Sequence, residues 1–145
     1  MSGNTKEWIV VISAIGGLVF AAVAEVLWLA RAKWTGAGSS IAFVLISNAI
    51  AIVLGGLVSF AVFGTMLAMA WSGALSDIPG GNWTLALLLA FCFTFPPVLL
   101  MLVKRVLLGL MKIRTGRQAW LFAFVAAIGT FAVSILPAVS LAYVI

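Results

Sequence analysis

The chain has 145 residues, of which 66% are hydrophobic and 8% are charged, and its formal net charge is +5. A soluble domain carries about 25% charged residues, so this composition excludes a water-covered globular protein and predicts an integral membrane protein. The sequence contains no histidine, which excludes histidine-ligated haem, zinc or copper and histidine acid–base catalysis.

Four apolar runs are each long enough to cross a bilayer, which takes about 20 residues in a helix. They cover approximately residues 8–30, 41–71, 83–103 and 120–145. The segments between them are rich in Gly, Ser, Pro and charged residues, as turns are. We therefore expect an all-α fold, a single domain over residues 1–145 with four transmembrane helices in an antiparallel bundle. No internal repeat is evident.

The first span contains one acidic residue, Glu25, about 7 Å from its basic end at 1.5 Å per residue. Its neighbours three and four positions away are apolar, so a partner for Glu25 must come from another helix. Ser13, Gly17 and Ala21 precede it at every fourth position, a spacing of small residues that favours close helix packing in lipid. Residues 22–24 are similar to a signal-peptidase site, but the hydrophobic run continues past them, so we interpret the whole segment as a span.

The second span repeats the spacing of small residues, and it is longer than a perpendicular span requires, so we expect it to tilt or to extend beyond the hydrocarbon. The fourth span has alanines at the same spacing, whereas the third is bulkier. We expect spans one, two and four to pack closely and span three to face more lipid or a partner. The packing faces join helices within one chain or form a subunit interface. In the first two spans they comprise Ser13, Gly17, Ala21, Ser47, Ala51, Gly55 and Ser59.

The third span contains Pro96 and Pro97 near its middle. A proline removes a backbone donor and clashes with the preceding turn, so we predict a kink there and a similar effect at Pro137 in the fourth span. The carbonyls freed by the kink either line a cavity or only accompany a change of helix direction. Cys92 lies in an apolar run, where a thiol stays neutral, and we assign it a structural role.

Depth along the helices predicts an intramembrane polar cluster. Counted from the same side of the membrane, Ser47 and Asn48 lie at about the depth of Glu25, but in the second span. At the end of the third span, Lys104 or Arg105 could reach inward along its alkyl stem. This cluster either fixes the register between helices or marks a proton or cation path, as intramembrane carboxylates often do.

The basic residues predict the orientation, because cytoplasmic loops carry an excess of Lys and Arg. Segments 31–40 and 104–119 should be cytoplasmic and both termini outside, and the tryptophans agree because they fall at the ends of the spans. Short loops and this charge bias favour a bacterial inner membrane. We also expect contacts with anionic lipid headgroups or a cytoplasmic partner. The cations concerned are Arg31, Lys33, Lys104, Arg105, Lys112, Arg114 and Arg117.

The sequence has no phosphate-binding glycine loop, no nucleophile elbow, no paired carboxylates and no metal-ligand spacing. We therefore expect a non-enzymatic protein with no catalytic residues, metal or cofactor, and with no nucleic-acid partner. The leading hypothesis is a protein that acts through helix–helix contacts, either an accessory or assembly subunit of a larger membrane complex or a small homo-oligomer. The alternative is a small proton- or cation-coupled transporter or channel that uses Glu25.

Two tripeptides, Ala24-Glu25-Val26 and Trp71-Ser72-Gly73, resemble motifs of the small multidrug-resistance transporters, which are four-helix proteins with an essential glutamate in the first helix. The resemblance implies a transporter that depends on Glu25. However, Glu25 lies near one end of its span rather than in the middle of the membrane. In addition, Trp71 ends the second span rather than lying in the third, and the chain is longer than is usual in that family. The sequence is therefore assigned to no family.

Overall fold

The computed structural model describes residues 3–73 and 81–144, and within these ranges it is all-helical, without a strand. Helix α1 runs Gly3–Arg31, α2 Ala37–Trp71, α4 Gly81–Leu110 and α5 Arg117–Val144. Each helix contains an apolar stretch that is long enough to cross a membrane. The prediction of an all-α chain with four such helices is therefore confirmed. Helix α4 extends beyond the predicted third span, 83–103, and includes Lys104 and Arg105. The side chain of Cys92 lies outside the described part of the chain.

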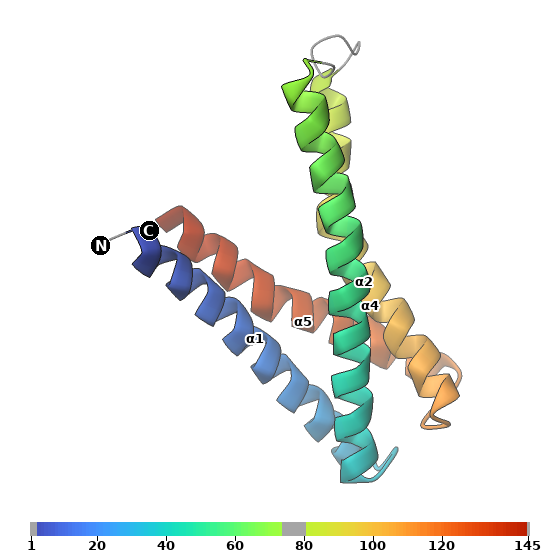
Figure 1. Cartoon of the computed structure of the whole chain (residues 1–145). Coiled ribbons are helices and arrows are strands. Elements are labelled where there is room, and N and C mark those ends of the chain that lie inside the picture. Colours follow the sequence, from blue (N-terminus) through green and yellow to red (C-terminus); the bar gives the residue numbers. More distant parts are fainter. Residues whose placement is uncertain (1–2, 74–80, 145) are drawn as a thin grey trace.

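The helices are arranged as two pairs, which we call the arms (Figure 1). Helix α1 packs along α5, and α2 packs along α4. The α1·α5 pair is antiparallel, because Gly17 lies against Ser134 whereas Trp28, further along α1, stacks edge-on against Phe122, earlier in α5. The arms meet near the turns 32–36 and 111–116, which we call the turn end, and diverge away from it (Figure 1). A closed antiparallel bundle therefore stays a prediction.

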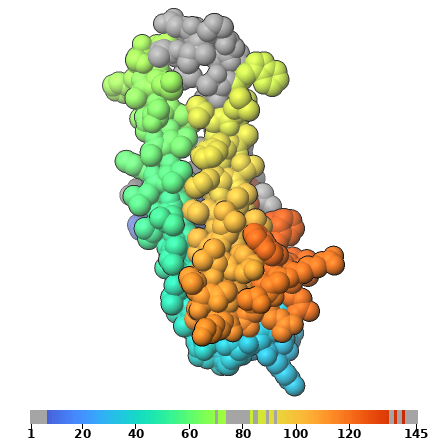
Figure 2. All heavy atoms as spheres, turned by 90° about the vertical axis from the view of Figure 1, so that its right-hand side faces the viewer, coloured from blue at the N-terminus to red at the C-terminus, as the bar shows by residue number. Residues whose placement is uncertain are grey.

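Helix α4 is not set apart from the other three. It packs against both α2 and α5, and Figure 2 shows α2 and α4 side by side, with the first part of α5 against the lower half of α4. The expectation that spans one, two and four pack closely with one another is therefore wrong, because α4 lies between α2 and α5. The expectation that span three faces more lipid or a partner agrees with the first half of α4, where bulky residues such as Leu87 and Phe93 are exposed. In its second half, Leu100, Lys104 and Leu108 form a buried stripe.

The helices α1 and α4 end with the same backbone geometry. The amide of Lys33 donates to the carbonyl of Ala30 (3.1 Å), and the next amide donates to the carbonyl of Leu29 (3.3 Å). At the end of α4, the amide of Lys112 donates to the carbonyl of Gly109 (3.1 Å), and the next amide donates to the carbonyl of Leu108 (3.0 Å). Both lysines have a positive φ, 54° and 53°. This is the Schellman pattern of helix termination, in which the left-handed position is usually a glycine.

These two helix ends belong to a repeat that runs through the structure with an offset of 79 residues, the separation between Glu25 and Lys104. Buried positions recur at this offset in both hairpins, α1–α2 and α4–α5. The repeat relates α1 to α4 and α2 to α5. The helix contacts follow this relation, because the α1·α5 contact corresponds to the α4·α2 contact and the α1·α2 contact to the α4·α5 contact. The buried pairs are Ala21/Leu100, Glu25/Lys104, Leu29/Leu108, Ser40/Ala119, Phe43/Phe122, Val44/Ala123, Ser47/Ala126 and Gly55/Ser134.

The fold is therefore two helical hairpins related by an approximate two-fold exchange, and each arm contains one helix from each hairpin. Few of the paired residues are identical, which is why the repeat is not visible in the sequence. The apolar core lies at the turn end, where Phe122 packs against Trp28, Trp34 and its own counterpart Phe43, with ring centroids 5.0, 5.7 and 6.2 Å away.

Candidate functional site

A buried ion pair joins the two hairpins just beyond this core. The ammonium nitrogen Nζ of Lys104 on α4 lies 2.6 Å from Oε2 of Glu25 on α1. Lys104 is 0% exposed and Glu25 is 4% exposed. Each residue lies one helical turn from a buried leucine, Leu29 on α1 and Leu108 on α4, so the two apolar stripes bring the charges together. A pair this deeply buried is costly unless its remaining hydrogen-bonding capacity is satisfied.

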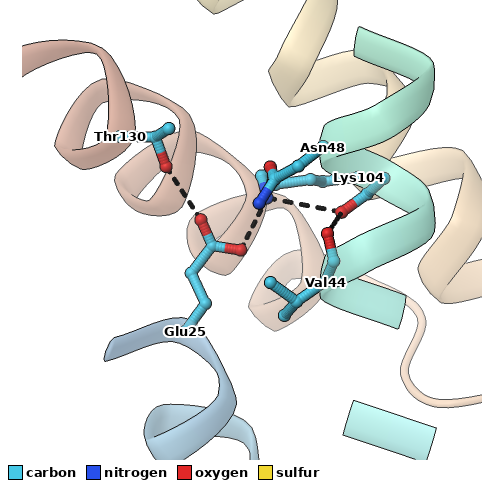
Figure 3. Close-up of polar contacts among 6 residues, drawn as sticks. Glu25, Val44, Asn48, Lys104 and Thr130 are labelled. Atoms are coloured by element: carbon cyan, nitrogen blue, oxygen red, sulfur yellow. Dashed lines mark hydrogen bonds and ion pairs between the residues drawn. The ribbon is translucent and has the colours of Figure 1, made fainter. Parts of the chain in front are cut away.

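The two other helices supply that hydrogen bonding (Figure 3). From α2, the side-chain oxygens of Asn48 and Ser47 accept from Lys104 Nζ at 2.9 and 3.4 Å. From α5, the hydroxyl of Thr130 donates to Oε1 of Glu25 at 2.8 Å. An ammonium group has three protons to donate, and Lys104 has three acceptors. All four helices therefore meet at one satisfied polar cluster, which we call the four-helix cluster: Glu25, Ser47, Asn48, Lys104 and Thr130.

Backbone carbonyls orient the hydroxyl groups of Ser47, within this cluster, and of Ser134, next to it. The hydroxyl of Ser47 donates to the carbonyl of Val44 at 3.1 Å, which leaves its oxygen free to accept from Lys104. One turn beyond the cluster on α5, the hydroxyl of Ser134 donates to the carbonyl of Thr130. Each hydroxyl proton thus has an acceptor. The geometry suits a static network in which every ammonium and hydroxyl proton has an acceptor.

The structure brings together four of the five residues that the sequence analysis places in the cluster. The fifth, Arg105, lies elsewhere, with its guanidinium 5.4 Å from the centroid of Trp120. Its Nε is buried and has no hydrogen-bond partner within the described part of the chain. Of the two cations considered from sequence, Lys104 is the one that pairs with Glu25, because it lies on the buried stripe of α4 and Arg105 lies one position around the helix.

Thr130 is not predicted from the sequence. The spacing of small residues indicates the face of α5 that contains the alanines at 119, 123 and 127, whereas Ala126, Thr130 and Ser134 form a second stripe that is also buried. The available signal is a pair of hydroxyl residues spaced four apart in an otherwise apolar span. Such residues lie on one helix face, and in lipid that face requires a polar partner.

The predicted packing faces have different surroundings on the two helices. On α1, Gly17 and Ala21 are buried against α5, and a Cβ added at Gly17 would overlap the carbonyl oxygen of Val133 and lie 2.7 Å from the Cα of Ser134. Ser13 is half-buried on the same helix. On α2, Gly55 is buried and would place a Cβ 3.7 Å from a side-chain carbon of Leu99, whereas Ala51 and Ser59 are half-buried beside an open space.

This open space, which we call the arm cavity, lies between the diverging arms and has a volume of about 270 Å³. Pro96 and Pro97 lie along it within the continuous helix α4. Its polar side chains near the four-helix cluster are those of Asn48 and Thr130. All four helices line it: Ala14 and Leu18 from α1, residues 48, 51, 52, 55, 56 and 59 from α2, residues 96, 97 and 100 from α4, and residues 130, 131 and 134 from α5.

At the turn end, most of the cations that the sequence analysis assigns to headgroup contact are exposed, namely Arg31, Lys33, Lys112, Arg114 and Arg117. Lys104 is instead fully buried in the ion pair, so it is not available to a headgroup. The reason is the stripe of α4 on which it lies, since that stripe faces the other helices rather than the surface.

No protein-family model, curated protein or solved structure matches this chain. Among the residues that the structure describes, no group of three or more His, Cys, Asp or Glu side chains is placed to hold a metal ion. The function of the site has to be inferred from its own geometry.

Proposed function

We propose that this chain is an integral membrane protein that acts through helix–helix contacts, as an accessory or assembly subunit of a larger membrane complex or as a small homo-oligomer. The observation that carries the proposal is the saturation of the four-helix cluster. Both carboxylate oxygens of Glu25 accept a hydrogen bond, and Lys104 has three acceptors. A neutralised pair that engages every helix holds their register and leaves neither of its own two charges unpaired in the membrane.

In the proposed orientation the turn end faces the cytoplasm of a bacterial cell and both termini lie outside. The exposed cations around the two turns support this, because cytoplasmic loops are enriched in Lys and Arg. They also suit contact with anionic headgroups, at about 1 kcal/mol for each cation close to the surface. In a bilayer the two arms would then diverge toward the outer leaflet.

The outer half of α2 offers a face for a partner helix. Gly64, Ala68 and Ser72 are exposed at every fourth position, and a Cβ added at Gly64 would meet no described atom within 4 Å apart from the adjoining backbone of its own helix. In Figure 1 this half of α2 lies away from α1 and α5. Small residues at this spacing allow two helices to approach closely in lipid. We propose that a single membrane-spanning helix, from a partner subunit or a second copy, packs here.

The test is association in mild detergent. The Gly64→Leu variant should bind its stoichiometric partner, or a second copy, with an affinity at least tenfold lower, because the leucine side chain holds the two helix backbones apart. The matched control is Gly16→Leu, at an exposed position on α1 that also has open space around a Cβ. A monomer with no stoichiometric partner, or equal losses for the two variants, would contradict the proposal.

One observation favours the second candidate, a proton- or cation-coupled transporter. Glu25 and Thr130 line a cavity of about 180 Å³ between α1 and α5, and Thr130 also lines the arm cavity. The carboxylate is thus close to two cavities rather than one. Reconstitution of the chain alone distinguishes the candidates, since a transporter would show coupled flux that Glu25→Gln abolishes, whereas the proposed subunit would show none.

A further inference from the structure

The arm cavity lies where the two hairpins meet. Among its lining residues, four pairs are counterparts under the 79-residue repeat: Leu18/Pro97, Ala51/Thr130, Ile52/Phe131 and Gly55/Ser134. The cavity is therefore centred on the approximate two-fold exchange, directly beyond the ion pair that is formed by two further counterparts. In transporters that are built from repeats, substrate sites commonly lie at the interface between the repeats.

Asn48 places an unused hydrogen-bond donor at this cavity. Lys104 can only donate, so the amide oxygen of Asn48 must face it, and the amide nitrogen is directed away. Within the part of the chain that the structure describes, that nitrogen has no hydrogen-bond partner. The hydroxyl protons of Thr130 and Ser134 are already donated to Glu25 and to a backbone carbonyl. Beside the four-helix cluster, the amide nitrogen of Asn48 is thus the donor that a bound molecule could use, and Ser59 lines the cavity three turns further along α2.

The charges near the cavity cancel. Its nearest ionic groups are Glu25 and Lys104, which are paired with each other, so an ionic ligand would find no counter-charge. The remaining lining is apolar or small, and pockets of this kind hold mostly apolar ligands that are oriented by a few polar groups. Gly55 and Gly56 keep the space open, and a Cβ added at Gly56 would meet no atom within 4 Å.

From these observations we propose that the arm cavity binds an uncharged lipid-like molecule, with its hydrocarbon part between the arms and one carbonyl or hydroxyl oxygen accepting from Asn48. This site is independent of the partner face at Gly64. Occupation would fill the gap between the arms, which in a bilayer would otherwise be open to lipid chains of every kind.

Photolabelling in lipid nanodiscs tests the proposal. The probe is hexadecanol with a diazirine in its chain, and the comparison probe is the corresponding fatty acid, which is anionic at pH 8. The alcohol should label residues 48–59 and 96–100 at least fivefold more strongly than residues 8–12 of α1, which lie outside both the cavity and the partner face. The fatty acid should label the cavity segments no more strongly than residues 8–12.

Two variants provide the matched pair. Gly56→Leu fills the cavity and should reduce labelling of its segments at least fivefold, whereas Gly64→Leu, in equally open space on the same helix, should leave it unchanged. If Gly56→Leu fails to fold, Ala51→Leu replaces it. Labelling spread evenly over all exposed segments, equal labelling by the fatty acid, or no loss in the filled variant would each overturn the proposal. Because Gly64→Leu tests the partner face separately, the two proposals can fail independently.

Discussion

At position 104 the chain buries an ammonium group completely, and only the choice of neighbours makes this tolerable. The carboxylate of Glu25 neutralises the charge, and Asn48 and Ser47 accept its other protons. From the sequence, the presence of an acid, an amide and a cation at matched depth could be predicted. The choice between Lys104 and Arg105 could not, because it depends on how far α4 is rotated about its axis.

Removal of one partner from the ion pair should be far more harmful than removal of both. Lys104→Met should lower the free energy of unfolding by about 3–5 kcal/mol, because it leaves Glu25 buried without a counter-charge. Lys104→Met combined with Glu25→Leu should recover most of that loss. The measurement is reversible unfolding in mixed micelles, and additive losses in this double-mutant cycle would contradict the pairing.

Exchange of the two charges tests the repeat at the same positions. Glu25→Lys with Lys104→Glu should unfold within about 2 kcal/mol of the native chain, whereas each single substitution should lose more than about 3 kcal/mol by juxtaposing like charges. The exchange is tolerable because the positions are counterparts, the amide of Asn48 can rotate to donate, and the hydroxyl of Thr130 can accept. A double variant as unstable as the singles would show that the two positions are not equivalent.

At the scale of the helices, close approach and termination are decided by single backbone positions. Gly17 lets α1 lie against the backbone of α5, and the lysines at 33 and 112 adopt the left-handed conformation that ends α1 and α4. The small-residue spacing on α1 could be predicted from sequence. The identity of its partner could not, since any span with small residues would have fitted, and the spacing alone does not distinguish α2 from α5.

Two neighbouring glycines on α1 should respond in opposite ways to alanine. Gly17→Ala should destabilise the chain by about 1–3 kcal/mol, because the added methyl group overlaps the α5 backbone. Gly16→Ala has open space and should stabilise it by roughly 0.5–1 kcal/mol through helix propensity. Thermal unfolding in detergent measures both, and a stabilising Gly17→Ala would mean that the arms are less closely packed than described.

The helix end at Lys112 should be improved by glycine. A non-glycine residue in the left-handed conformation costs about 1–2 kcal/mol, which is partly offset by the greater freedom of glycine in the unfolded chain. Lys112→Gly should therefore raise stability by up to about 1 kcal/mol, and Lys112→Ala should not. If both variants are equally stable, the positive φ at this position carries no strain.

For the molecule as a whole, the charge distribution predicts which side each turn faces. In a Cys92→Ser background, single cysteines at Thr35 and Thr115 should react with a membrane-impermeant thiol reagent only after the cells are opened. A cysteine at Gly80 should react in intact cells. Reaction of the cysteines at 35 and 80 from the same side would exclude the proposed four-span topology.

The sequence by itself determined that the chain is all-α, with four helices apolar and long enough to cross a membrane, and that Glu25 needed a partner from another helix. These conclusions depend on composition and on the period of one helix, which are local properties. Only the tertiary structure decided the pairing of helices into two arms, the choice of Lys104, the part played by Thr130 and the repeat of 79 residues. Those features depend on the rotation and crossing of helices, which arise from contacts between residues far apart in the chain. Six of the eight buried pairs of the repeat differ in side chain while both members stay buried.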